Sequence, residues 1–299
     1  MKITVIFTGG TIACSNKNGA LSPDGANSFT LIEMYRAEDS SVEFAAESPY
    51  FILSENLGVE HWDKLCECIR GVRGSDGIIV THGTDTLPFT AAYLGLKLGL
   101  CDVPVVLVSA AYPLSDSRSN GLDNFRGAVG FIRSGAGKGV FVSYKNSGEN
   151  VRIHRAASVL PHMPFSDSVL SVRGNYFADI VGGEVVLNPG FYGDSFGDFS
   201  ERGASGKVLW LRAHPGMVYP SVDGIKAVLL EGYHSGTLPT ARVDFRGFCA
   251  SARTAGVPLY LTGSEEGFDY ESKQAFDELG ISVLPPMSPA AAYAALLLK

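Results

Sequence analysis

Short apolar runs alternate with stretches of helical spacing along the first half of the chain. Largely apolar runs at 3–7, 78–80 and 103–108 are typical of strands that are buried on both faces of a sheet. Between them, residues 59–72 carry apolar side chains near i, i+3, i+4 spacing, which predicts an amphipathic helix, and 86–100 predicts another helix. This alternation predicts a parallel sheet with right-handed crossovers.

The rest of the chain extends this pattern and suggests a second domain. Two further strands are expected at 139–144 and 151–155. Residues 188–206 are rich in glycine and charge without a clear period, so we place a linker at about 191–205, between domains at 1–190 and 206–299. Strands are then predicted at 208–212, 227–231, 258–262 and 281–284, and helices at 245–255, 270–279 and 288–298.

The expected fold class is therefore α/β. It has a larger N-terminal parallel-sheet domain of Rossmann-like or flavodoxin-like type and a smaller C-terminal α/β domain. Ser288 followed by Pro289 is a sound start for the last helix, with serine as the cap and proline at the first helical position.

Composition and charge argue against several classes of function. A net charge of -7 and a pI near 5.4, with scattered basic residues, argue against a nucleic-acid partner. No run approaches the roughly 18 apolar residues of a membrane span, and the chain enters a strand without a leader pattern, so we expect a cytoplasmic protein. The five cysteines fit neither a disulfide framework nor a zinc site, and the histidines are too dispersed for metal ligands, so no metal is expected.

Polar residues follow two of the predicted strands. One strand runs into Thr8-Gly-Gly-Thr-Ile12 and the other into His82-Gly-Thr-Asp-Thr86. The carboxyl ends of parallel strands form the crevice where open α/β sheets bind ligands. We therefore expect the hydroxyl group of Thr11 to lie in one pocket with Thr84 and Asp85.

These two motifs, in this order and after these strands, resemble the bacterial-type L-asparaginase family. Further resemblances extend over most of the chain, including 213–217 and 231–239. The resemblance implies hydrolysis of the side-chain amide of L-asparagine to L-aspartate and ammonia, without a cofactor, by a homodimer or homotetramer. It assigns the catalytic roles to Thr11, Thr84 and Asp85.

The same resemblance suggests how a small amino-acid amide would be held. Ser54 and Glu55 resemble the pair that binds the carboxylate and amino groups of the substrate, although a serine and a glutamate can equally cap a helix. Gly10 and Gly83 complete the expected substrate-binding set.

Amide hydrolysis needs a nucleophile, a proton donor for the leaving ammonia and hydrogen-bond donors for the oxyanion. Thr11 can supply the nucleophile, and the glycines before it let backbone N–H groups approach the oxyanion. The alternative is that Thr8-Gly-Gly-Thr11 is only a strand-to-turn transition. Asp85 offers an anion for the amino group of the substrate, and the Thr84 hydroxyl can position water or act as a second nucleophile.

Two family features are missing. The position expected for a lid tyrosine holds Ala20, within a polar segment that predicts a hairpin or mobile loop. The lysine that the family couples to its aspartate is absent from 149–155, and Lys145 is expected to be a solvated lysine.

A buried aspartate without a cation tends to protonate. We therefore expect Arg152, His154 or Arg155 within ion-pair reach of Asp85. Arg152 and His154 are favoured because alternate residues of a strand share a face.

Three alternatives to an asparaginase stay open at this point. The protein can be a related amidase acting on glutamine or another amide. It can be a homologue that binds amino acids without hydrolysing them, since two catalytic features are missing. A nucleotide-binding protein is disfavoured, because no phosphate-binding glycine motif follows the first strand.

Overall fold

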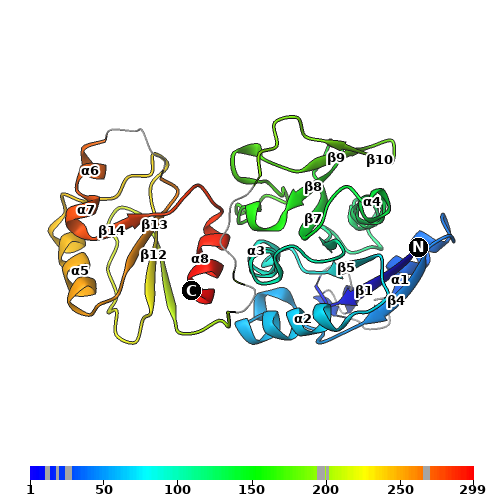
Figure 1. Ribbon diagram of the computed structural model, residues 1–299, viewed down its shortest axis with the longest axis horizontal. Coiled ribbons are helices and arrows are strands. Elements are labelled where there is room, and N and C mark those ends of the chain that lie inside the picture. The colour runs from blue at the N-terminus through cyan, green and yellow to red at the C-terminus, as the bar shows by residue number, and fades with distance from the viewer. Residues whose placement is uncertain (11–13, 18–19, 24–28, 194–198, 200–201, 265–269) are drawn as a thin grey trace. The chain divides into compact units, whose positions relative to one another are not determined.

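The computed structural model of the chain forms two compact units, Met1–Ser200 and Glu201–Lys299 (Figure 1). It describes all residues except 11–13, 18–19, 24–28, 194–198, 200–201 and 265–269. The linker predicted at 191–205 includes several of these residues and stays a prediction.

The first unit is built on an eight-stranded sheet in the order β10-β9-β8-β7-β6-β5-β1-β4. Its parallel part consists of β4 (Glu43–Glu47), β1 (Lys2–Phe7), β5 (Gly77–Thr81), β6 (Val105–Val108) and β7 (Val140–Lys145). Its antiparallel extension consists of β8 (Val151–Arg155), β9 (Ala178–Val181) and β10 (Glu184–Leu187).

The predicted α/β class is confirmed, and the three antiparallel strands refine it. Only residues 146–150 separate β7 from β8, which is too short for the helical crossover that a parallel neighbour requires. The chain therefore turns back on itself after β7.

Helices cover both sides of this sheet, as Figure 1 shows for α3 (Leu87–Leu98) and α4 (Gly121–Ser134). Short α1 (Thr30–Arg36) and α4 pack on the face that carries Ile3 and Val106. On the other side, α2 (Val59–Gly71) packs against α3, where the indole nitrogen of Trp62 donates to Thr90 Oγ1 at 2.9 Å. β5 and β6 are buried throughout, which explains their continuous apolar sequences.

The segment after β1 was expected to be a hairpin or a mobile loop, and it forms a hairpin. Its strands β2 (Cys14–Lys17) and β3 (Ala20–Pro23) pair antiparallel.

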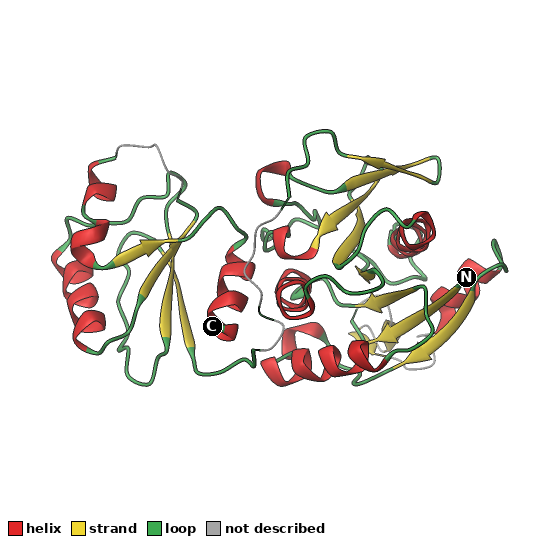
Figure 2. Ribbon diagram, in the orientation of Figure 1, coloured by secondary structure: helices red, strands yellow, loops and turns green. Residues whose placement is uncertain are grey.

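The second unit has a four-stranded parallel sheet in the order β11-β12-β13-β14 (Figure 2). Its elements are β11 (Val208–Arg212), β12 (Ala227–Glu231), α5 (Val243–Thr254), β13 (Leu259–Thr262), α6 (Glu271–Gln274), α7 (Phe276–Leu279), β14 (Ile281–Val283) and α8 (Pro289–Leu298). The single helix predicted at 270–279 is interrupted at Ala275. The predicted start of α8 is confirmed, since Ser288 Oγ accepts from the amide of Ala290 at 3.2 Å.

In the part of the chain that the structure describes, no helix is both long and apolar enough to cross a membrane.

Candidate active site

The ends of β1 and β5 lie side by side at the carboxyl edge of the first sheet. The two strands pair in parallel, with Phe7 opposite Thr81, so both polar motifs begin at the same level. A Cβ atom on Gly10 would overlap the backbone nitrogen and Cα of Gly83, and Gly10 has a φ of +79°. The two motifs therefore touch each other at glycines, where a side chain would separate them.

Ser54 lies against the second motif. It begins the short 3-10 helix η3 (Ser54–Asn56) and is only 4% exposed. A Cβ atom on Gly83 would overlap its hydroxyl group, and Thr86 Oγ1 donates to its carbonyl oxygen at 2.9 Å. Glu55, the next residue, is exposed. The structure thus brings Gly10, Ser54 and Gly83 together, while their roles toward a substrate stay predictions.

Thr84 and Asp85 lie between the end of β5 and the start of α3. The carbonyl oxygen of Thr84 accepts from the amide of Leu87 at 3.2 Å, at the start of the helix. A carboxylate is favourable near a helix N-terminus, because the partial positive charge of the backbone lies there. Asp85 is exposed and Thr84 is half-buried, so an anion is accessible at this edge.

Thr11, the predicted nucleophile, lies outside the described residues, and Gly10 is the last described residue before it. Ala20 belongs to β3, but its side chain also lies outside the described part.

Arg152, His154 and Arg155, predicted to supply a positive charge to Asp85, make other contacts in the structure. Arg152 pairs instead with Glu149 Oε2 at 2.8 Å and with Asp179 Oδ1 at 3.4 Å. Its guanidinium also lies over the ring of Tyr176, 4.6 Å from the centroid. These two carboxylates and the tyrosine ring stabilise the positive charge of the Arg152 guanidinium.

His154 and Arg155 also contact residues other than Asp85. His154 is buried, its Nδ1 lies 2.8 Å from Ser171 Oγ, and burial lowers its pKa to about 3, so it is neutral. Arg155 pairs in register with Phe141, near the start of β7, and donates to the carbonyl oxygen of Lys138. The prediction was wrong because β8 runs antiparallel to β7 and carries His154 and Arg155 away from the carboxyl edge. Arg152 stays near that edge, opposite Tyr144, but pairs with Glu149 and Asp179.

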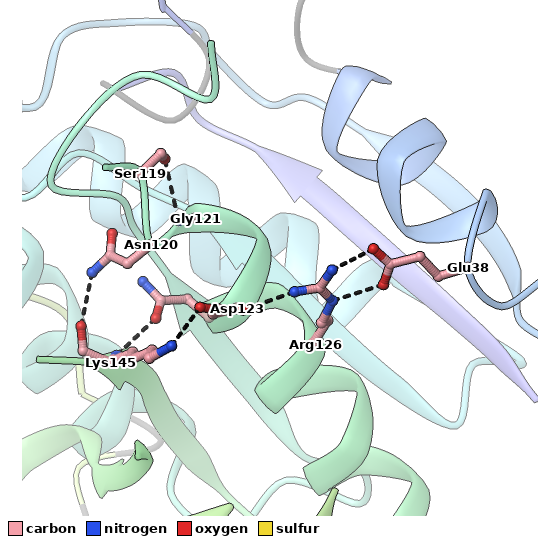
Figure 3. A network of polar contacts seen from close by, with 8 residues as sticks. Glu38, Ser119, Asn120, Gly121, Asp123, Arg126 and Lys145 are labelled. Carbon is pink, nitrogen blue, oxygen red and sulfur yellow. Dashed lines mark hydrogen bonds and ion pairs between the residues drawn. The ribbon is translucent and has the colours of Figure 1, made fainter. Parts of the chain in front are cut away.

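Lys145 belongs to a network of ion pairs with Asp123, Arg126 and Glu38 (Figure 3). Its ammonium is 2.7 Å from Asp123 Oδ2, and Asp123 also binds Arg126, which pairs with Glu38. Burial alone would raise the pKa of Asp123, but hydrogen bonds from Lys145 and Arg126 bring it below its usual value. Lys145 is 40% exposed and is paired, so the expectation of a solvated lysine is only partly right.

Two asparagines near the start of α4 hold the ends of β6 and β7 together. Asn120 accepts from the amide of Ala111 at 2.9 Å. It also donates to the carbonyl oxygen of Lys145 at 2.9 Å (Figure 3). Asn124 donates to the carbonyl oxygen of Ser109 at 2.8 Å and accepts from the amide of Lys145 at 2.7 Å. Sequence reasoning missed this role, although two asparagines one helical turn apart were a usable signal.

His162 is the site residue that sequence reasoning missed most plainly. Burial lowers the pKa of its ring, while the backbone of Ser168, the carboxylates of Asp85 and Asp167 and the backbone of Thr84 act in the opposite direction. Its Nε2 atom is buried and has no hydrogen-bond partner among the described residues. Burial outweighs these influences, so the pKa of His162 stays below its ordinary value.

No group of three or more histidine, cysteine, aspartate or glutamate side chains in the described part of the chain is arranged to hold a metal ion. The described cysteines, Cys66, Cys68, Cys101 and Cys249, are free thiols.

Comparison with known proteins agrees with this geometry. The family model "Asparaginase, N-terminal" matches residues 2–187. A glutamyl-tRNA(Gln) amidotransferase subunit from Methanobrevibacter smithii is 27% identical over 280 residues, which are 87% of this chain and 62% of that protein. A probable periplasmic L-asparaginase from Haemophilus influenzae is 35% identical over 150 residues, which are 48% of this chain and 43% of that protein. The chain thus spans only part of the length of either relative.

Among solved structures, the thermostable L-asparaginase from Thermococcus kodakarensis has the same fold. It superposes with a TM-score of 0.80 at 23% identity, covering 100% of this chain and 92% of that one. Because the family model covers more than half of the chain and the fold agrees with it, this protein belongs to the asparaginase family.

Proposed function

We propose that this protein hydrolyses the side-chain amide of L-asparagine to L-aspartate and ammonia, with Thr11 as the nucleophile. The observation that supports this best is the contact between Gly10 and Gly83, which joins the two motifs at one edge of the sheet. Thr11 follows Gly10 directly in the sequence.

The proposed reaction has two steps. The Thr11 hydroxyl oxygen attacks the amide carbon, the hydroxyl proton is transferred to the amide nitrogen, the C–N bond breaks and ammonia leaves. Water then cleaves the resulting ester and releases aspartate. Because the glycines carry no side chains, the oxyanion can approach backbone N–H groups closely and be stabilised by them.

Substrate binding is proposed to use the residues that surround this contact. Asp85 binds the ammonium group of the substrate, since it is an exposed carboxylate at the same edge. Ser54 and Glu55 hold its carboxylate and amino groups, and Thr84 positions water or acts as a second nucleophile.

A related amidase is the second candidate. The resemblance to a component of a glutamyl-tRNA(Gln) amidotransferase supports glutamine, or an amide on a larger carrier, as the substrate. It also supports assembly with another chain in place of the homodimer or homotetramer that we propose. A cytoplasmic location is likewise a proposal, supported by likeness to a probable cytoplasmic L-asparaginase from Campylobacter jejuni.

Ammonia release by the purified protein tests the function. The panel contains L-asparagine, L-glutamine and succinamate, which lacks the amino group. We expect L-asparagine to react fastest and succinamate to react poorly, because it offers Asp85 no ammonium. If no amide releases ammonia while L-asparagine binds in calorimetry, the protein is a binding homologue and not an enzyme.

A further inference from the structure

A cavity of about 860 Å³, called the α5 cavity below, lies within the second unit, between α5 and the connection from β11 to β12. One wall is the segment 217–223, and the other is a side of α5 that includes Asp244, Phe248, Ser251 and Ala255. Their spacing of three and four residues places them along one side of the helix. Cavities of roughly 300–1,000 Å³ are typical of sites that bind small molecules.

Part of the lining is apolar and fixed to the hydrophobic core of the second unit. Val222 and Phe248 are only 6% and 5% exposed and belong to that core. Tyr219 packs against the core as well, and its ring is stacked on that of Phe248 with 5.0 Å between the centroids. Val218, at the same wall, is 87% exposed. The α5 cavity therefore offers an aromatic and aliphatic surface to a ligand.

The serine and threonine hydroxyl groups of the lining act toward a ligand as acceptors. Ser251 and Thr254 each donate to the backbone carbonyl oxygen four residues earlier in α5, at 2.9 and 3.0 Å. Ser221 donates to Asp223 Oδ2 at 2.6 Å. Because a hydroxyl group has a single proton to donate, only the lone pairs of these oxygens are left for a ligand.

Asp223 adds a negative charge that is not paired. Among the described residues, its hydrogen bonds are with Ser221, and no cation forms an ion pair with it. The other lining carboxylate, Asp244, is paired with Arg242 at 2.6 Å. No lysine, arginine or histidine is among the described residues that line the cavity. A ligand there meets one unpaired anion and no lining cation.

A cavity of about 450 Å³ beside α4 has the opposite character. Among its lining carboxylates, Asp123 is paired with Lys145 and Arg126, and Glu38 is paired with Arg126 (Figure 3). Cations of the protein therefore already neutralise these acids. The unpaired charge of Asp223, and not the mere presence of carboxylates, sets the α5 cavity apart.

We propose that the α5 cavity binds a small amphipathic amine. Its apolar body packs on Tyr219 and Phe248, and its ammonium group donates to Asp223. An ammonium group has three N–H donors and no acceptor, which matches side-chain oxygens that act mainly as acceptors. The ring of Tyr219 is also a favourable neighbour for a cation. A carboxylate ligand is disfavoured, because Asp223 repels it.

Three ligands with the same phenyl group test the charge preference. 2-Phenylethylamine carries an ammonium group, 2-phenylethanol a neutral hydroxyl group and 3-phenylpropanoate a carboxylate. In calorimetry with the full chain at pH 7, the amine is expected to bind about 10-fold or more tightly than the alcohol, because charge-assisted hydrogen bonds are the stronger ones. The propanoate is expected not to bind. No binding of the amine, or equal binding of the amine and the alcohol, overturns the proposal.

Two substitutions locate the site. Asp223→Asn removes the charge and is expected to weaken amine binding about 10-fold or more, with Asp277→Asn, at an exposed position of α7, as the control. Ser251→Leu fills the cavity and is expected to abolish amine binding. Ser134→Leu is its matched control, because Ser134 is an exposed serine of α4 whose hydroxyl group also donates to a backbone carbonyl oxygen.

Each result decides one part of the proposal. Amine binding that is unchanged in Asp223→Asn overturns the role of that carboxylate, and binding that is unchanged in folded Ser251→Leu overturns the α5 cavity as the site. Circular dichroism checks the fold, and if Ser251→Leu does not fold, Asp223→Asn decides. None of these measurements involves amide hydrolysis. Failure of the proposed function therefore leaves this inference standing, and absence of amine binding leaves the proposed function standing.

Discussion

Gly10 and Gly83 approach each other so closely that a Cβ atom on Gly10 would overlap the backbone of Gly83. Each glycine follows a strand of the central parallel pair, and Ser54 packs against Gly83 from a third segment. Segments far apart in the sequence thus meet through backbone atoms.

Gly10→Ala is expected to destabilise the protein and to reduce its activity severely. The φ of +79° disfavours any residue with a Cβ atom, and the overlap with Gly83 adds to a strain of about 1–3 kcal/mol. Urea denaturation and kcat/KM measure the two effects. Gly71→Ala is the control, because a Cβ atom there would meet nothing within 4 Å. Equal stability and activity of the two variants would contradict the close contact.

Asp85→Asn is expected to raise KM for L-asparagine by about 10- to 100-fold. The ammonium group of the substrate loses a charged acceptor, and such hydrogen bonds contribute about 1.5–3 kcal/mol. Steady-state kinetics measure this, with Asp223→Asn in the second unit as the control. Unchanged saturation behaviour in Asp85→Asn would show that Asp85 does not bind the substrate.

Asn146→Ala is expected to lower kcat, because Asn146 directly follows β7 and holds the segment 160–170 at the carboxyl edge of the first sheet through Val169. Asn175 offers a matched control: it accepts from the amide of Tyr192 at 3.0 Å and donates to its carbonyl oxygen at 2.9 Å. Each substitution removes the same pair of hydrogen bonds to one backbone residue, and Asn146→Ala also removes a bond to Glu149 Oε2, so we expect losses of stability of about 1–3 kcal/mol in both. Only Asn146→Ala should lower kcat and expose the amide of Val169 to hydrogen exchange. Equal loss of kcat in both variants would argue for a general effect of instability.

The free energy of unfolding is expected to fall as the pH falls from about 6.5 toward 4. Burial depresses the pKa of His82 to about 4 and that of His154 to about 3. Below about 6.5 the unfolded chain binds protons at both histidines, while the folded protein does not. Each histidine then lowers stability by about 1.4 kcal/mol per pH unit. Urea denaturation between pH 7 and 5 measures the slope, and equal stability throughout would mean that these rings are protonated in the folded protein.

The sequence was informative wherever local pattern decides structure. Apolar runs ending in glycine and threonine located the ends of β1 and β5, and Ser288 with Pro289 located the start of α8. Such features depend on near neighbours in the chain, so periodicity and capping residues reveal them.

What the sequence did not reveal depends on strand direction and on distant contacts. Arg152 appeared close to Asp85 in the expected arrangement, but the tight turn after β7 reverses the chain and pairs Arg152 with Glu149 and Asp179. His162 lies in a loop without any period. Hydrogen bonds between Asn146 and Val169 hold this loop at the end of β7, and no spacing in the sequence indicates them.

The central claim is that Thr11 attacks a side-chain amide, and Thr11→Ala tests it most directly. L-asparagine labelled with ¹⁵N in its side-chain amide is incubated with the wild type or with Thr11→Ala, and labelled ammonium is followed by NMR, with circular dichroism to check the fold. We predict that the wild type releases labelled ammonium and that folded Thr11→Ala releases none above the buffer rate, because the substitution removes one hydroxyl group and no large apolar side chain. Release of labelled ammonium by folded Thr11→Ala at more than a few per cent of the wild-type rate would contradict Thr11 as the sole nucleophile.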